Sequence, residues 1–210
     1  MKKLLFSLLF ITTAVVGWAE SRTDKLLREL QNPKSEYVFV IAHRGDWRNF
    51  PENSLEAIES AIDMGVDIVE IDVHRTADGE LVVCHDGSLN RTTNGKGRIR
   101  ELTLDSLRKC RLRAGHGAVT HYKLPTLAEA LDVCKGRILI NIDKGINYYD
   151  QILAMLVERD MVNQVIIKSG KSAATMKEFF AKHEKNMLYM PIITYSSRAW
   201  AKHEVKFNDY

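Results

Sequence analysis

The sequence predicts an α/β fold in which a parallel β-sheet is covered by helices, and three observations support this prediction. Short apolar runs alternate along the chain with segments of helical periodicity. Most of these runs are hydrophobic at successive positions, which is typical of strands buried on both faces. The chain has 210 residues, 45% of them hydrophobic, with no internal repeat and no Gly/Ser linker, as expected for one large domain or two small ones.

The predicted strands are short, apolar and bounded by turn residues. The first, YVFVIA, is rich in β-branched and aromatic residues, and the segment ends at Gly45. The run VDIVEIDVH is the second, and an Asp78-Gly79 turn joins it to the third. In order, the six predicted strands cover residues 37–42, 66–74, 81–84, 137–143, 164–168 and 188–194.

Helical patterns fill the intervals between these strands. Over residues 54–64 the apolar side chains recur at helical spacing. Asn53 or Ser54 can cap the start of this helix, and Gly65 can end it. Further helical patterns cover residues 20–34, 126–135 and 196–206, and others precede the fifth and sixth strands.

Residues 87–122 break the alternation of strands and helices. This segment is rich in arginine and glycine and lacks a long apolar run. We expect it to be a loop-rich cap insertion over the carboxyl end of the sheet. The alternative is a plain solvated connection.

The first 19 residues have the layout of a secretory signal peptide. Two lysines precede an uncharged run over residues 4–18, and the segment ends in Gly17-Trp18-Ala19, with small residues where a signal peptidase reads. We therefore expect a secreted or periplasmic domain over residues 20–210, with no stable membrane span after cleavage. The alternative is an uncleaved anchor, which is disfavoured because a span needs about 20 apolar residues.

Charge and cysteine content exclude several classes of protein. The formal net charge of +3 falls to +1 once the two lysines of the leader are removed, so no binding to nucleic acid through counterion release is expected. A charged fraction of 27% does not indicate disorder. The cysteines are Cys84, Cys110 and Cys134; their spacing does not suggest zinc, no disulfide is assigned, and Cys84 is expected to be a buried apolar residue.

Two carboxylates, Glu70 and Asp72, lie in the second predicted strand. Side chains alternate along a strand, so residues two apart share one face. Two carboxylates among apolar neighbours are costly to bury unless a cation neutralises them. Oxygen donors without cysteine favour a divalent metal ion, Ca²⁺ or Mg²⁺. The alternative is an exposed strand face with solvated acids.

Two histidines, His43 and His85, follow the first and third predicted strands. Histidine titrates near neutral pH, so a neutral and a protonated imidazole can act as base and acid. Arg44 offers a planar guanidinium suited to a phosphate oxygen. Together with a metal ion, these groups are the equipment for cleaving a phosphate ester.

Five segments of the chain resemble the glycerophosphodiester phosphodiesterase family. They are HRG at 43–45, ENS at 52–54, EIDVHRTADGELVVCHD at 70–86, RTTNGKG at 91–97 and LPTLAEAL at 124–131. The resemblance covers roughly residues 37–145. It implies a TIM (β/α)8-type barrel with a small inserted cap, a fold of eight strands and about 250 residues.

The resemblance also implies an activity and a set of site residues. The expected reaction is hydrolysis of a small-molecule glycerophosphodiester to glycerol 3-phosphate and an alcohol, and no oligomeric state is predicted. The site residues that the resemblance assigns are His43 and His85 for catalysis, Glu70 and Asp72 as metal ligands, Arg44 for the phosphate, and Glu52 beside the metal.

The fourth predicted strand departs from the family pattern. The family has Glu-x-Lys here, whereas this chain reads Asn141-Ile142-Asp143-Lys144. Asp143 can replace the glutamate as third metal ligand, but Lys144 falls on the opposite face unless the strand bulges. We expect Lys168, at the end of the fifth strand, to supply the missing cation at the phosphate. The alternative is a merely solvated lysine.

Six strands are two fewer than a closed barrel requires. We therefore expect a barrel truncated after about six strands, from a shortened reading frame or as a degenerate remnant, with two strand edges and part of the core exposed. Two other functions remain open. A related phosphodiesterase could act on a lysophospholipid or another head group, chosen by residues 87–122. The chain could also be a catalytically silent phosphate-ester binding protein.

Overall fold

The computed structural model describes residues 20–193. The predicted signal peptide, the predicted helix over residues 196–206 and the last residue of the sixth predicted strand lie outside this range. The strands are β1 (Ile41–His43), β2 (Ile68–Arg75), β3 (Leu81–Val83), β4 (Leu139–Asp143), β5 (Val165–Ser169) and β6 (Leu188–Pro191). The α-helices are α1 (Arg22–Gln31), α2 (Leu55–Asp63), α3 (Leu104–Arg108), α4 (Leu127–Cys134), α5 (Tyr149–Arg159) and α6 (Ala173–Phe180), and the 3-10 helices are η1 (Ile99–Glu101), η2 (Gly145–Tyr148) and η3 (Val162–Gln164).

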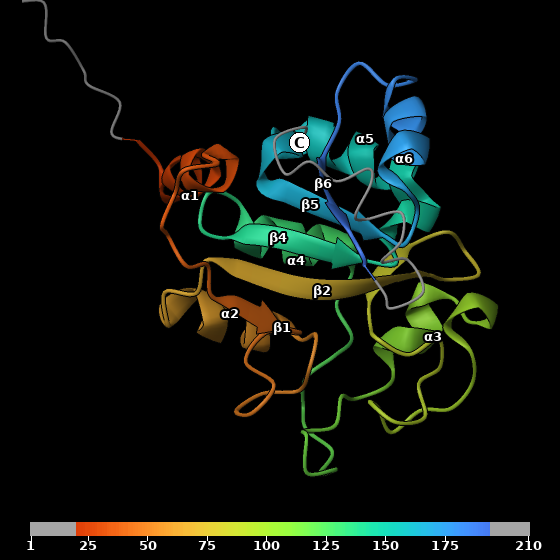
Figure 1. Cartoon of the computed structure of the whole chain (residues 1–210). Helices are drawn as coiled ribbons and strands as arrows, with labels where there is room; N and C mark the ends of the chain where they lie inside the picture. Colours follow the sequence, from red (N-terminus) through yellow and green to blue (C-terminus); the bar gives the residue numbers. More distant parts are fainter. Residues whose placement is uncertain (1–19, 194–210) are drawn as a thin grey trace, which may run out of the picture.

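The strands form one twisted sheet in the order β1-β2-β4-β5-β6, in which each neighbouring pair is parallel (Figure 1). β3 lies off this path and pairs antiparallel with β2. Residues 81–84, predicted as a third strand after the Asp78-Gly79 turn, therefore form a hairpin with β2 and are not a further strand of the parallel series. Residues 76–80 make only a tight turn, whereas a parallel crossover needs a dozen residues or more.

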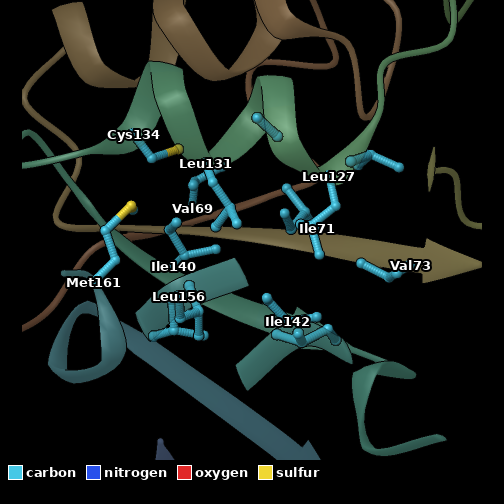
Figure 2. Close-up of a cluster of buried hydrophobic side chains, with 14 of the residues drawn as sticks. Val69, Ile71, Val73, Leu127, Leu131, Cys134, Ile140, Ile142, Leu156 and Met161 are labelled. Carbon is cyan, nitrogen blue, oxygen red and sulfur yellow. The ribbon is translucent and has the colours of Figure 1, made fainter. Parts of the chain in front are cut away.

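The main hydrophobic core lies between the sheet and the helices that cover its outer face. Figure 2 shows side chains of β2 and β4, among them Val69, Ile71 and Ile140, packed against α4 and α5. These strand residues are fully buried. The alternation along β2 and β4 therefore sends the odd-numbered residues of β2 into this core and the even-numbered ones to the other face of the sheet.

The inner face of the sheet is apolar at the amino ends of its strands. Ile68, Leu139 and Ile166 form a second cluster there with Leu26 of α1. α1 accordingly lies at the amino end of the sheet, while the insertion with α3 lies beyond the carboxyl end of β2 (Figure 1). The polar residues of the inner face are thus confined to the carboxyl end.

Helix boundaries follow local capping. Ser54, not Asn53, caps α2 by accepting a 3.0 Å hydrogen bond from the Ala57 amide. Thr126 and Glu129 form a reciprocal capping box at the start of α4. The predicted helices over 54–64 and 126–135 are confirmed within one or two residues at each end.

The insertion over residues 87–122 has its own small core. Leu89, Ile99, Leu107 and Leu112 are buried together with Val82 and Cys84 of the β3 segment. Isolated antiparallel bridges, such as that between Ser88 and Arg98, hold its loops together. The segment is therefore a packed unit rather than a solvated connection.

The first edge of the sheet is exposed. Val38, just before β1, is 82% exposed, and Val40 and Ile41 are about half exposed. Ile192 and Ile193, just after β6, are also exposed. Exposure in and next to β1 and just after β6 agrees with the expected open sheet. Among residues 20–193, no helix is long and apolar enough to cross a bilayer.

Candidate active site

Three carboxylates meet at the carboxyl end of the sheet. The pairing of β2 with β4 sets Glu70 opposite Asn141 and Asp72 opposite Asp143, all on the inner face. One oxygen from each of Glu70, Asp72 and Asp143 lies within 4.8 Å of the others. Glu70 and Asp72 are 4% and 0% exposed, so solvated acids on an open strand face are excluded for this pair.

The donor set of this carboxylate cluster fits a hard divalent cation. Three carboxylates supply only oxygen ligands, which suit Ca²⁺ or Mg²⁺. A further buried oxygen, Oδ1 of Asn141, has no hydrogen-bond partner among the described residues. Buried acceptors are rarely left unpaired, so this oxygen is consistent with a cation or water in the same region.

Two lysines neutralise the cluster. The Lys168 ammonium donates a 2.9 Å hydrogen bond to Glu70 and lies 3.5 Å from Asp143. Burial alone would lower the pKa of Lys168, but these carboxylates more than offset it and raise that pKa. Lys168, which the sequence placed only at a strand end, therefore lies inside the site.

Lys144 is the second of these lysines, and the expectation that it falls on the opposite face is wrong. β4 ends at Asp143, and Lys144 then adopts a left-handed conformation with φ of 61°. This turn sends its ammonium to Oδ1 of Asp72 at 2.7 Å and to the His85 carbonyl at 2.8 Å. Burial would raise the pKa of Asp72, but the hydrogen bonds from Lys144 and Asn53 more than offset burial and hold it below its usual value.

The loop after β1 folds back onto the carboxylates. Gly45 lets this loop pass close to α2, because a Cβ there would lie 2.7 Å from the Ala57 main chain. Asn53 donates a 3.0 Å hydrogen bond to Asp72. Arg44 and Asn53, like Lys144, are non-glycine residues with positive φ, so three such residues surround one carboxylate.

Arg44 lies between two acids. Its Nη1 donates to Glu52 at 3.0 Å, and its Nε lies 3.5 Å from Asp72 without forming a hydrogen bond. Because this nitrogen is buried and has no hydrogen-bond partner among residues 20–193, Arg44 retains a donor for an additional acceptor. The structure thus brings Arg44 to the cluster, as the sequence led us to expect.

Both predicted histidines reach the same rim. His43 Nε2 is 3.9 Å from Glu70, and its side chain is 63% exposed. His85 Nδ1 is 2.7 Å from Asp86. Arg91 donates two hydrogen bonds to Asp86, at 2.8 and 2.9 Å. These bonds are the main reason why the pKa of Asp86 lies well below its usual range.

Glu52 lies next to the carboxylate cluster, because Arg44 contacts both Glu52 and Asp72; its expected position beside a metal ion stays a prediction. It accepts hydrogen bonds from Arg44 and from both terminal nitrogens of Arg91, and it is not one of the three clustered carboxylates. Burial would raise its pKa, but the two arginines more than offset burial and lower it. Glu52 therefore ties the Arg44 loop to the insertion through Arg91.

Asn53, Asp86 and Arg91 are site residues to which the sequence reasoning gave no role in the site. Asn53 entered as an alternative helix cap, and Asn53 and Arg91 also belong to segments that resemble the family, but neither was assigned a contact in the site. The signal for Asp86 was its position beside His85, since a carboxylate next to a histidine can orient it. No periodicity indicates the pairing of Arg91 with Glu52, which are 39 positions apart.

The sheet and its site define a class of protein. Parallel strands wrapped by helices, with acids, lysines and histidines gathered at the carboxyl ends, are the arrangement of TIM-barrel proteins that act on anionic ligands. The chain belongs to the glycerophosphoryl diester phosphodiesterase family, whose model matches residues 43–197. The family resemblance and the barrel-type fold expected from the sequence are confirmed.

Individual relatives agree with this assignment. The chain is 37% identical over 140 residues to a glycerophosphodiester phosphodiesterase of Caldanaerobacter subterraneus, covering 63% of this chain and 58% of that protein. It is 37% identical over 134 residues to human glycerophosphodiester phosphodiesterase 1, covering 62% and 40% of the two chains.

Solved structures show the same fold. A glycerophosphoryl diester phosphodiesterase from Parabacteroides distasonis superimposes with a TM-score of 0.73 at 26% identity, covering 87% of this chain and 64% of that one. An Oleispira antarctica phosphodiesterase in complex with the product sn-glycerol-3-phosphate gives a TM-score of 0.61 at 26% identity, covering 79% and 71%. The chain thus spans less than two thirds of the Caldanaerobacter and Parabacteroides proteins.

Proposed function

We propose that this protein is an exported, metal-dependent phosphodiesterase that hydrolyses glycerophosphodiesters to glycerol 3-phosphate and an alcohol. The observation that carries the proposal is the meeting of Glu70, Asp72 and Asp143 at a rim that also bears His43 and His85. The Oleispira relative, whose structure contains sn-glycerol-3-phosphate, supports this product. The sequence of residues 1–19 supports export.

The phosphate would be held by cations of this chain. The buried Nε of Arg44 has no hydrogen-bond partner in the described part of the chain, and Lys168 lies beside two of the carboxylates. We assign both to the phosphoryl oxygens, where positive charge stabilises the charge that develops during cleavage. Glu70, Asp72 and Asp143 would hold Ca²⁺ or Mg²⁺, which when bound withdraws negative charge from the phosphate.

The two histidines would move the protons. One imidazole takes a proton from the attacking oxygen, either of water or of the neighbouring glycerol hydroxyl. Attack by the hydroxyl would expel the alcohol and form a cyclic glycerol phosphate, which water would then open to glycerol 3-phosphate with the two imidazoles in exchanged roles. The other gives a proton to the oxygen of the departing alcohol, which is a poor leaving group as an alkoxide. Asp86 orients His85 through Nδ1 and leaves Nε2 for the reaction.

The test is hydrolysis of glycerophosphocholine by the purified chain, with and without EDTA and with Ca²⁺ or Mg²⁺ restored. We expect metal-dependent release of choline and glycerol 3-phosphate. His43→Ala and His85→Ala should each lower the rate at least about 100-fold, the usual size of a general acid or base contribution. His116→Ala, at an exposed position of the insertion, is the matched control. Full activity of either site variant would refute the acid/base assignment.

A further inference from the structure

A pocket lies beside the candidate site, where the end of β2, the insertion and η2 meet. Its volume is about 430 Å³, within the range of small-molecule sites. The lining includes His74, Arg75, Ser88, Arg98, Arg100 and Tyr148. Among the described residues that line it, three are arginines and none is an acid. The pocket is therefore suited to an anion.

The arginines of this pocket differ from the other arginines of the insertion. Arg91 and Arg108 form ion pairs with carboxylates, and Arg111 and Arg113 donate to main-chain carbonyls. Each of those four side chains is therefore already engaged in holding the insertion together.

The pocket arginines lack such neutralising partners. Arg75 and Arg98 form no ion pair with any residue in the range 20–193, and Arg100 has only Glu101 at 3.7 Å. Arg75 instead lies over the ring of Tyr148 at 5.5 Å, a contact that positions its guanidinium without neutralising it. The pocket thus presents uncompensated positive charge.

One main-chain carbonyl joins this pocket to the candidate site. His74, which lines the pocket, has its Nε2 3.1 Å from the carbonyl oxygen of His85. Lys144 donates to the same oxygen and to Asp72 of the carboxylate cluster. The pocket is therefore joined to the carboxylate cluster. The head group of a substrate whose phosphate lies at the cluster would be near enough to enter the pocket.

We propose that this pocket is the subsite for a head group that carries its own phosphate, so that the preferred substrates are glycerophosphodiesters with an anionic alcohol portion. The inference rests on the proposed function and names the substrate class of that site. Guanidinium groups match phosphate through paired charge-assisted hydrogen bonds, which an uncharged head group cannot accept with equal strength.

The test uses two substrates that differ by one phosphate, glycerophosphoinositol and glycerophosphoinositol 4-phosphate. The variant is Arg75→Gln with Arg98→Gln, and the control is Lys25→Gln with Arg28→Gln on α1, which removes the same charge at the other end of the sheet. We expect the pocket variant to lower kcat/KM about tenfold or more for the phosphorylated substrate only, because two charge-assisted contacts are lost. The control should change neither value by more than about twofold.

A binding measurement separates this proposal from the proposed function. Calorimetry with inositol 4-phosphate should show binding to the unaltered chain, weaker binding to the pocket variant, and no binding of inositol. If no diester is hydrolysed but this binding pattern holds, the proposed function fails and the subsite stands. Equal loss on both substrates, or unchanged binding in the pocket variant, would overturn the subsite.

Discussion

The ammonium of Lys144 donates a 2.7 Å hydrogen bond to Oδ1 of Asp72, a residue 72 positions earlier in the chain. Lys168 makes the equivalent contact with Glu70. The three carboxylates of the cluster are therefore partly neutralised by the chain itself. A metal ion bound at these carboxylates would thus compete with the two lysines for the same oxygens.

Replacing Lys168 tests whether it serves the phosphate or only the carboxylates. We expect Lys168→Met to lower kcat for glycerophosphocholine more than about tenfold, because a charge that acts on the transition state is lost. Affinity for Ca²⁺, measured by calorimetry, should not weaken, since a competing cation is gone. Lys171→Met, just beyond β5, is the control. A change in kcat of less than about twofold would leave Lys168 with no part in the reaction.

Metal binding should raise thermal stability through the carboxylate cluster. At 100 times its dissociation constant, a ligand that binds only the folded state stabilises it by about 2.7 kcal/mol. For a chain of this size we expect the Tm in Ca²⁺ or Mg²⁺ to rise by roughly 5–10 °C over that in EDTA. Glu70→Gln should abolish the rise, whereas Glu158→Gln, exposed on α5, should retain it. An undiminished rise in Glu70→Gln would place the ion elsewhere.

Acid should weaken the link between the insertion and the site. The folded-state pKa of Asp86 lies below its unfolded value of 3.8, mainly because Arg91 donates to it. Its contribution to stability is therefore complete above about pH 5 and is lost as the pH falls through 3.8 toward the lower folded value. Urea unfolding between pH 5.5 and about 2.5 should show a shallower loss for Asp86→Asn than for the unaltered chain. Parallel curves would contradict the pairing of Asp86 with Arg91.

The three thiols should differ in reactivity. Burial, the main cause in both cases, raises the pKa of Cys84 to about 11 and that of Cys134 to about 12, whereas Cys110 is partly exposed. At pH 8 we expect one thiol to react quickly with a disulfide reagent, and two to react only after denaturation. Cys110→Ser should remove the fast phase. Rapid reaction of all three thiols would show that the two buried sites open readily.

The sequence allowed prediction of those parts of the fold that depend on local pattern. Glu70 and Asp72 share a face because strand alternation has a period of two, and Ser54 caps α2 because its hydroxyl can reach the first-turn amides. His43, Asp143 and Lys168 lie at or near the ends of parallel strands, so their gathering at one edge of the sheet was predictable, whereas His85 reaches that edge after the antiparallel strand β3.

Other features depend on information that a local pattern lacks. The apolar run Leu81–Val83 does not by itself indicate whether the strand pairs parallel or antiparallel. The short connection to β2 makes the pairing antiparallel. The position of Lys144 follows from a single left-handed residue at the end of β4, which no apolar periodicity reveals. The link between Glu52 and Arg91 forms only when the insertion packs against the loop after β1.

Arg44, Asn53 and Lys144 all hold left-handed backbone conformations around Asp72. Glycine would adopt these conformations with less strain at each position, yet it would remove the side chain that reaches a carboxylate of the site. Selection of variants for higher thermal stability would therefore favour glycine at these three positions. Selection for stability alone would remove side chains of the site while leaving the fold unchanged.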